Sequence, residues 1–341
     1  MLSSETSPSI QVLRERDLQR LLDVPTALAI IEQTYRNDGA GNSHTLSHPT
    51  ALASGTGDIG DARYRIKGAT LHAEQITGIR LISDPPTHAD KASKSRHMLW
   101  VYDDRNASPI GLLNETWLHR FRTALTAVVA AKFLARPDSK TVALIGAGNI
   151  ARHLFPALTD NFDLQEIRVV ARHYESAERF CHEQSATTSA ELVAVETVPQ
   201  AIDGADIVIT LTMADAPVIQ PGMLSPGSFL CSMGETEEVE FGVLDETDRF
   251  IVDEFEYATV LGDMSHWLKN ELTTREKLEQ QVDAHIGQVV SRQRPGRQSA
   301  TERIYAIIQG MAICDLALAN FALQRAAEQD VGESLNLFNE I

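Results

Sequence analysis

The spacing of apolar side chains changes along the first third of the chain. Residues 10–37 place leucine, isoleucine and alanine roughly on one face, which predicts a helix. Residues 38–62 are rich in Gly, Ser, Thr and Asp and predict a loop. Between residues 63 and 113 the apolar runs shorten to strand length and are separated by turn residues. This pattern predicts a mostly antiparallel sheet.

The pattern changes again at about residue 115. An alanine-rich helix is expected over Thr123–Leu134, followed by a continuously apolar strand over Thr141–Ile145. Strand and helix patterns then alternate, which predicts a parallel, doubly wound sheet. The further strands are expected at Ile167–Val170, Leu192–Val195, Ile207–Leu211, Ser228–Ser232 and Phe250–Val252.

The end of the chain predicts a return to the first domain. Residues 304–327 have the apolar spacing of a long helix. We therefore expect an α/β protein with a discontinuous α+β domain, residues 1–120 and 305–341. A second domain with a doubly wound parallel sheet is expected over residues 121–304.

A glycine-rich turn follows the first strand of the second domain. The segment Gly146-Ala-Gly148-Asn149-Ile150-Ala151 fits the GxGxxA pattern and leads into a helix. Gly146 would make the tight turn, Gly148 would let the backbone approach a pyrophosphate, and Ala151 would let helix and strand pack closely. The free amides at the helix start, from Asn149 and Ile150, would bind the phosphates. The context predicts a dinucleotide site.

The residues after the second strand indicate which dinucleotide binds. An NAD site usually has Asp or Glu there to bind the ribose hydroxyls. This chain has Arg172 and His173 instead. Arg172 can pair with a 2′-phosphate, so we expect NADP(H) to be favoured over NAD(H). The alternative is that Arg172 is an ordinary surface arginine.

Composition excludes several classes of protein. The net charge is −17, from 30 basic and 47 acidic residues, which disfavours nucleic acid and anionic membranes as partners. No apolar stretch is long enough to span a membrane, and the N-terminus lacks a signal core. The three cysteines are far apart, as expected of buried thiols in a cytoplasmic protein. Without HExxH or a Cys/His cluster, no metal is expected.

Several segments together resemble the ornithine cyclodeaminase/mu-crystallin family. The match runs in order along nearly the whole chain. The tail and the residues around 287–297 look most like the branch that contains N-(2-amino-2-carboxyethyl)-L-glutamate dehydrogenase, an enzyme of 2,3-diaminopropionate synthesis. The matching segments are Arg122-Thr-Ala124, AAKFLARPD, ALIGAGNIARH, Gly204–Thr210, Pro221–Gly227, Ile251–Asp253, Gly287-Gln288, Arg294–Arg297, Gly310–Ala312 and Gly332–Phe338.

The resemblance implies a homodimer whose substrate and dimerisation domain lies next to a Rossmann domain. It also implies hydride transfer at the α-carbon of an amino or imino acid. The family includes cyclodeaminases, alanine dehydrogenase and ketimine reductases, so membership alone does not fix the substrate. A cyclodeaminase that recycles its cofactor and a non-catalytic, mu-crystallin-like binding protein are the alternatives.

The resemblance also implies a set of substrate-binding arginines. Arginine suits a carboxylate because its planar fork makes two parallel hydrogen bonds. Arg122 stands where the family has a carboxylate-binding arginine, and Arg63 or Arg65 matches a second one. Arg80 departs from the family, which usually has lysine there. Arginine can bind a carboxylate but cannot exchange a proton, and the spacing of Lys67 does not make that lysine a replacement.

An acidic segment supplies the expected proton-exchanging group. Glu235 follows the strand that ends at Ser232, and ligands in this architecture bind at the carboxyl ends of strands. The family match falls on Glu235, with Thr236 or Glu237 as alternatives. Such a carboxylate could take a proton from an amine; the plainer interpretation is a solvated loop. With several arginines nearby, we expect a substrate with more than one carboxylate, such as an N-carboxyalkyl amino acid.

Overall fold

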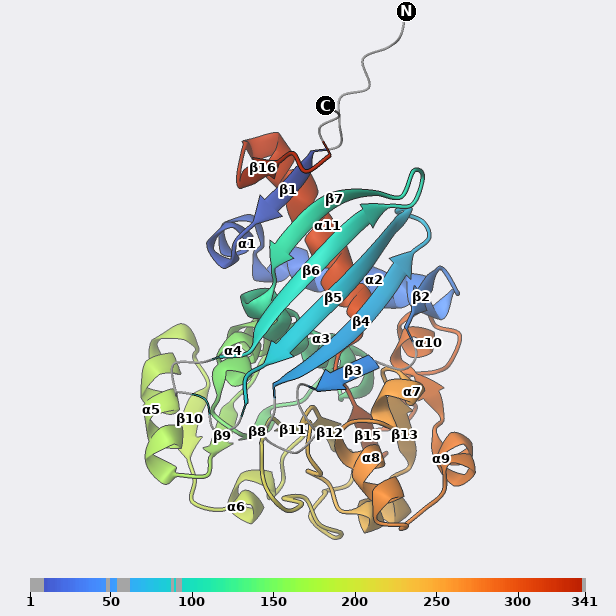
Figure 1. Ribbon diagram of the computed structural model, residues 1–341. Coiled ribbons are helices and arrows are strands. Elements are labelled where there is room, and N and C mark those ends of the chain that lie inside the picture. The colour runs from blue at the N-terminus through green and yellow to red at the C-terminus, as the bar shows by residue number, and fades with distance from the viewer. Residues whose placement is uncertain (1–8, 47–49, 54–61, 87–88, 90–93, 339–341) are drawn as a thin grey trace, which may run out of the picture. The chain divides into compact units, whose positions relative to one another are not determined.

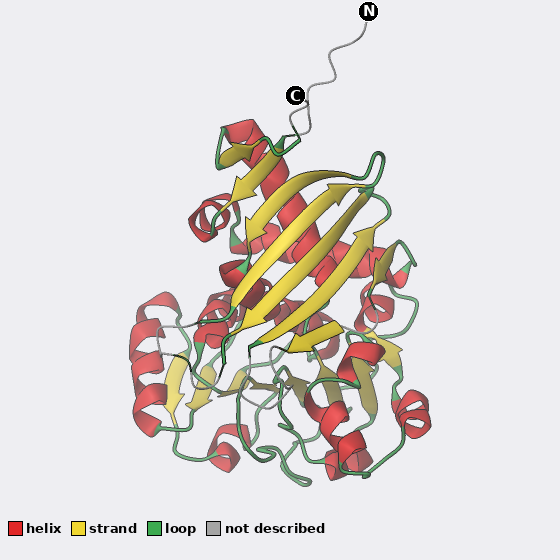
Figure 2. Ribbon diagram, viewed as in Figure 1, coloured by secondary structure: helices red, strands yellow, loops and turns green. Residues whose placement is uncertain are grey.

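The computed structural model describes residues 9–46, 50–53, 62–86, 89 and 94–338. These residues form two compact units, each with its own sheet (Figure 2). The first unit draws on Met1–Thr34, Gly41–Arg122 and Met311–Ile341. The second draws on Tyr35–Ala40 and Thr123–Gly310. The first unit is therefore discontinuous in sequence.

The sheet of the first unit has the order β16-β1-β7-β6-β5-β4-β2, and β3 also pairs with β4. Strands β4 to β7 form the antiparallel meander expected from the sequence, whereas β1 pairs in parallel with β7. The strands are β1 (Ile10–Leu13), β2 (Ser43–Thr45), β3 (Thr50–Ala53), β4 (Arg63–Leu71), β5 (Ile76–Asp84), β6 (Arg96–Asp103), β7 (Ser108–Asn114) and β16 (Glu333–Leu335).

One long helix covers a face of this sheet. Helix α11 (Ala312–Gln329) runs along β4, β5 and β6 (Figure 1). Its apolar residues are buried, among them Leu316 and Leu323. Gly78 and Gly111 allow this close approach, because a Cβ at either would lie less than 3 Å from one of these leucine side chains. Helix α1 (Glu15–Leu21) also belongs to this unit, whereas α2 (Val24–Gly39) and α3 (Thr116–Leu134) each contribute residues to both units.

The second unit has the doubly wound parallel sheet predicted from the sequence. Its order is β10-β9-β8-β11-β12-β15-β13-β14, and all its strand pairs are parallel. The strands are β8 (Thr141–Ile145), β9 (Glu166–Val170), β10 (Glu191–Ala194), β11 (Ile207–Thr210), β12 (Phe229–Ser232), β13 (Arg249–Val252), β14 (Ala284–His285) and β15 (Ile304–Ile307).

The chain order reverses beside β8, which lies between β9 and β11. Ligands of doubly wound sheets bind at such a reversal, at the carboxyl ends of the strands. The helices of this unit are α4 (Asn149–Asn161), α5 (Tyr174–Gln184), α6 (Val198–Ile202), α7 (Phe255–Ala258), α8 (Gly262–Lys269), α9 (Arg275–Gln281) and α10 (Ile286–Val290), with 3-10 turns at Ser185–Thr187 and Phe241–Glu246.

Three expectations about local structure are corrected. Ile10–Leu13 form a strand before the first helix, and the predicted loop over residues 38–62 contains β2 and β3. Residues 47–49 and 54–61 lie outside the described part. The predicted helix over residues 304–327 is wrong at its start, because Ile304–Ile307 is a strand between β12 and β13. A short apolar run gives no periodicity that separates the two forms.

No helix among the described residues is both long enough and apolar enough to cross a membrane.

Candidate functional site

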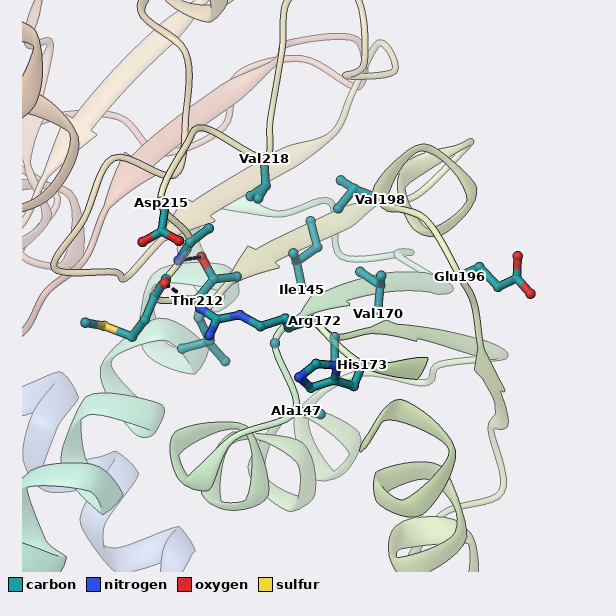
Figure 3. Close-up of a pocket in the computed structure, with 15 residues that line it drawn as sticks. Ile145, Ala147, Val170, Arg172, His173, Glu196, Val198, Thr212, Asp215 and Val218 are labelled. Atoms are coloured by element: carbon teal, nitrogen blue, oxygen red, sulfur yellow. Dashed lines mark hydrogen bonds between the residues drawn. The ribbon is translucent and has the colours of Figure 1, made fainter. Parts of the chain in front are cut away.

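A pocket of about 620 Å³ lies at the carboxyl ends of β8, β9 and β11 in the second unit (Figure 3). The turn after β8 contributes Gly146 and Ala147, and the end of β9 contributes Arg172 and His173. The loop after β11, residues 211–215, forms another wall. We call this the nucleotide pocket. It stands where the sheet order reverses, as a cofactor site in this architecture should.

The glycine motif has the geometry that a pyrophosphate requires. Gly146 has φ +116°, and a Cβ there would lie 2.5 Å from the Leu211 carbonyl oxygen. Gly148 caps α4 and is exposed, and a Cβ there would meet no described heavy atom within 4 Å beyond its chain neighbours and its own helix. Asn149 and Ile150 begin the helix, so their amides have no partner within it. The cradle therefore fits a dinucleotide.

Arg172 reaches across one side of the nucleotide pocket. Its Nη2 donates a hydrogen bond of 2.9 Å to the Met213 carbonyl, and the residue is exposed (Figure 3). His173 is the cap of α5 and also lines the pocket. Glu196 lines the pocket too, but its carboxylate points away from the other lining residues in Figure 3. The three residues that directly follow β9, Ala171, Arg172 and His173, therefore include no carboxylate.

The first unit contains a group of buried ionisable side chains that we call the charge cluster. Its members come from β4, β5, β6, the β7–α3 connection, α3 and α11. All are largely removed from solvent. They are Lys67, Arg80, His97, Glu115, His119, Arg122 and Asp315.

Asp315 links the two arginines of the charge cluster. Its Oδ1 accepts a 2.7 Å hydrogen bond from Arg122 Nε, and its Oδ2 lies 3.6 Å from Arg80 Nη1. Burial works against ionisation of Asp315, but Arg122 and Arg80 outweigh it and lower its pKa. Burial also opposes the charge on Arg122, and Asp315 more than offsets this, so the pKa of Arg122 is raised. Both groups are therefore charged.

Arg80 has a carboxylate partner of its own and one unused donor. Its Nε donates to Glu115, and both side chains are almost fully buried. Its Nη1 makes no hydrogen bond although it is buried. A buried donor without an acceptor costs about 1–3 kcal/mol. Asp315 Oδ2, at 3.6 Å, forms an ion pair with this nitrogen but no hydrogen bond.

The two histidines hold the arginines by accepting hydrogen bonds. Arg80 Nη2 lies 2.9 Å from His97 Nδ1, and Arg122 Nη2 lies 3.0 Å from His119 Nδ1. Because a guanidinium can only donate, both Nδ1 atoms are acceptors. Burial first, and then Arg80 and Arg122, lowers the pKa of His119 well below its usual value. His119 is therefore neutral.

The candidates on β4 lie on one face of that strand. Arg63, Arg65 and Lys67 alternate with side chains of the opposite face, and Lys67 lies directly opposite Arg80 on β5. Arg65 Nη2 forms an ion pair of 3.1 Å with Asp84, while Arg63 is exposed. The structure thus brings Lys67 together with Arg80 and Arg122, and it places Arg65 on the same face.

The acidic segment after β12 divides into an exposed and a buried part. Glu235 is exposed, and Glu237 is half-buried, with its pKa raised by burial. Glu238 is fully buried and accepts hydrogen bonds from Thr210 Oγ1 at 2.7 Å and from Gly234 N at 2.8 Å. It therefore ties the ends of β11 and β12 together. Glu235 stands on the loop that this contact holds.

Within the parts of the chain that the structure describes, no three His, Cys, Asp or Glu side chains are grouped as a metal site requires.

The chain matches the ornithine cyclodeaminase/mu-crystallin family over residues 10–330. It belongs to that family. A relative from Staphylococcus aureus (strain NCTC 8325 / PS 47), N-((2S)-2-amino-2-carboxyethyl)-L-glutamate dehydrogenase, is 28% identical over 268 residues, which cover 77% of this chain and 78% of the relative. The resemblance predicted from sequence is confirmed.

Two solved structures have the same fold. An archaeal alanine dehydrogenase, described as a dimer with bound NAD, has a TM-score of 0.86 at 22% identity and covers 97% of this chain and 100% of its own. The Δ1-pyrroline-2-carboxylate reductase of Thermococcus litoralis, solved with NADH and L-proline, has a TM-score of 0.84 at 22% identity, covering 96% and 100%. The Rossmann fold of this family member is thereby established.

Sequence reasoning missed the carboxylates that organise the site. Asp315 lies among the buried residues Cys314 and Leu316, and a lone acid in an apolar helix stripe signals a buried cation partner. That signal was available from the sequence. Nothing local distinguishes Glu238 from the neighbouring Glu237, because only the pairing of β11 with β12 brings Thr210 to it.

Replacing Gly148 by alanine should weaken dinucleotide binding without unfolding this family member. Gly148 has φ −85°, which alanine adopts readily, and the added methyl group meets no protein atom closely. The methyl group would instead occupy the space for a pyrophosphate. We expect the Kd for NADPH to rise at least about tenfold, the loss of one hydrogen bond to a charged group, with an unchanged melting temperature. Titration calorimetry and thermal melting test this, and an unchanged Kd would contradict it.

Proposed function

We propose that this protein is an NAD(P)-dependent oxidoreductase that acts on the C–N bond of an amino acid, an N-carboxyalkyl amino acid or a cyclic imine. The nucleotide pocket carries the proposal, because its glycine cradle and helix start suit a dinucleotide pyrophosphate. The named relatives, a dehydrogenase of an N-carboxyalkyl amino acid, an alanine dehydrogenase and a pyrroline-carboxylate reductase, support it. A bound nicotinamide would exchange a hydride with the substrate α-carbon.

The second unit is proposed as the cofactor domain and the first as the substrate and dimerisation domain. Arg80 and Arg122 are the proposed carboxylate-binding groups, since both guanidinium groups are buried and Arg80 retains an unused donor. Arg63 or Arg65, which lie on the same face of β4, is proposed for a second carboxylate. Glu235 is the candidate from the sequence for proton exchange at the substrate nitrogen. We place the reaction in the cytoplasm, in keeping with three buried free thiols.

The apolar face of the first sheet is proposed to form a homodimer. It faces away from the charge cluster, since its side chains alternate with those of the cluster along β4 and β5. Ile79 is 45% exposed and Leu81 is 39% exposed. On the neighbouring strand β6, Trp100 lies opposite Ile79 and Met98 lies opposite Leu81. Contiguous exposed apolar side chains of this kind mark association surfaces, and the archaeal alanine dehydrogenase is described as a dimer.

Oxidation of an amino acid should be visible as a rise in absorbance at 340 nm. The purified protein would be mixed with NADP⁺ or NAD⁺ and with L-alanine, L-proline, L-ornithine or N-(2-amino-2-carboxyethyl)-L-glutamate. We expect turnover with at least one amino acid. Ammonia release from L-ornithine without an absorbance change would instead indicate a cyclodeaminase. Binding of neither dinucleotide would overturn the proposal.

Arg172 is proposed to make NADP(H) the favoured cofactor. In Arg172→Ala a charge-assisted hydrogen bond to the 2′-phosphate is lost, worth about 1.5–3 kcal/mol. We therefore expect the KM for NADPH to rise about tenfold to a hundredfold, while the KM for NADH changes less than about twofold. Steady-state kinetics with both cofactors measure this. Equal effects on the two cofactors would argue against a role for Arg172 in the preference.

Charges on the apolar sheet face should separate the subunits. We expect the double variant Ile79→Glu, Leu81→Glu to be monomeric at about 10 µM, because burying two unpaired carboxylates is prohibitive. Light scattering after gel filtration gives the mass. Leu272→Glu, at a residue 48% exposed in the second unit, is the matched control and should leave the mass unchanged. A double variant with the wild-type mass would exclude this face.

A further inference from the structure

Lys67 occupies a central place in the charge cluster. The antiparallel register of β4 and β5 sets it directly opposite Arg80, and side chains in that relation have Cβ atoms about 4.5–5.5 Å apart. Lys67 is only 8% exposed, and Arg80 is 1% exposed. The lysine is therefore held beside a buried arginine on the face of the sheet that carries the proposed substrate-binding groups.

The charges of the cluster do not balance while Lys67 is protonated. Arg80 is bonded to Glu115, and Arg122 is bonded to Asp315. Protonated Lys67 then adds a third positive charge to two negative ones. A net charge is expensive to bury. Since arginine keeps its proton in proteins, Lys67 is the cation that can lose its charge.

The surroundings of Lys67 favour its neutral form. Burial, and next Arg80 and Arg122, lowers the pKa of Lys67 well below its usual value, while Asp315 opposes the shift. The Nδ1 atoms of the two histidines already accept hydrogen bonds from arginines. The titratable and charged groups that interact with Lys67 are Arg65, Arg80, His119, Arg122 and Asp315. His97 and Glu115 complete the cluster through their contacts with Arg80.

We infer that Lys67 is the catalytic residue that exchanges a proton with the substrate nitrogen. The inference rests on the proposed function. In the oxidative direction neutral Lys67 takes one proton from the substrate ammonium group, which leaves a free amine. The α-carbon would then transfer a hydride, one proton with two electrons, to a bound oxidised nicotinamide, and the lone pair of the amine nitrogen would form the C=N bond of an iminium. In the reductive direction protonated Lys67 returns the proton to the amine.

Substrate binding prepares Lys67 for this step. A substrate carboxylate that reaches Arg80 or Arg122 adds a negative charge to the cluster and makes Lys67 a better base. Lys67 therefore accepts a proton more readily once the substrate carboxylate is bound than before it binds. Arg80 cannot do this itself, because a guanidinium does not release its proton.

The first test needs no substrate. The full-length wild-type protein is labelled with a trace of acetic anhydride between about pH 6 and pH 11, and mass spectrometry follows each lysine. We expect the midpoint for Lys67 to lie at least about one pH unit below that of Lys277, an exposed lysine that serves as the control. Equal midpoints would overturn the inference.

The second test compares the activities of variants and wild-type protein. The substrate is the one of the four amino acids in the absorbance assay above that gives the wild-type protein its largest change at 340 nm. Lys67→Arg keeps the charge but cannot exchange a proton, so kcat should fall about 10²- to 10⁴-fold. The pH dependence of kcat/KM should also lose one ionisation. In Lys67→Ala added ethylamine should restore part of the rate. Lys277→Arg should behave as wild type.

The outcomes separate the inference from the proposed function. Wild-type protein that binds no dinucleotide contradicts the proposed function. Active wild-type protein whose Lys67→Arg variant keeps the wild-type rate and pH profile contradicts the inference alone. Loss of the ionisation in Glu235→Gln, and not in Lys67→Arg, assigns the proton exchange to Glu235 and overturns the inference. If a Lys67 variant does not fold, the labelling of wild-type protein decides.

Discussion

The buried carboxylate of Asp315 allows Arg122 to be present inside the first unit, and it also lies close to Arg80. Without it, Arg122 would have lost its water without gaining a partner for its charge. Removing one partner of a buried ion pair costs about 3–5 kcal/mol, a large share of the stability of an ordinary domain. The contact also fixes geometry, because Asp315 holds Arg122 Nε at 2.7 Å and lies 3.6 Å from Arg80. The orientation of the Arg122 guanidinium thus depends on one side chain of α11, whereas Glu115 and His97 hold Arg80.

The alternation of side chains along β4 and β5 gives the two faces of one sheet different properties: one face carries the buried charges and the other carries exposed apolar side chains. Lys67 and Arg80 point to the face that α11 covers, while Ile79 and Leu81 point to the other. A shift of register by one residue would exchange the two faces. The charged side chains would then leave the buried cluster, and the apolar side chains would leave the exposed face. The turn after β8 likewise has two roles in the nucleotide pocket. Gly146 makes the sharp bend, and Gly148 leaves the backbone beside it free of side-chain atoms.

Sequence patterns predicted the parallel sheet well, because its strands are continuous apolar runs between turn residues and its glycine motif is local. They failed where the decisive contact joins distant residues. The strand at Ile304–Ile307 looked helical because four apolar residues carry no period, and only its place between β12 and β13 makes it a strand. Arg80 and Arg122 were identified as candidates, but their carboxylate partners were not. Lys67 was dismissed on its spacing along the chain, whereas the strand register places it opposite Arg80.

The position of Asp315 in the chain has a consequence for how the protein is made. Its partner Arg122 lies 193 residues earlier, and most of the second unit is encoded between them. At about 5–20 residues per second, a ribosome needs on the order of ten to forty seconds to cover that distance. During this time the arginines of the nascent first unit lack their carboxylate from α11. The first unit to emerge is therefore the last to be completed.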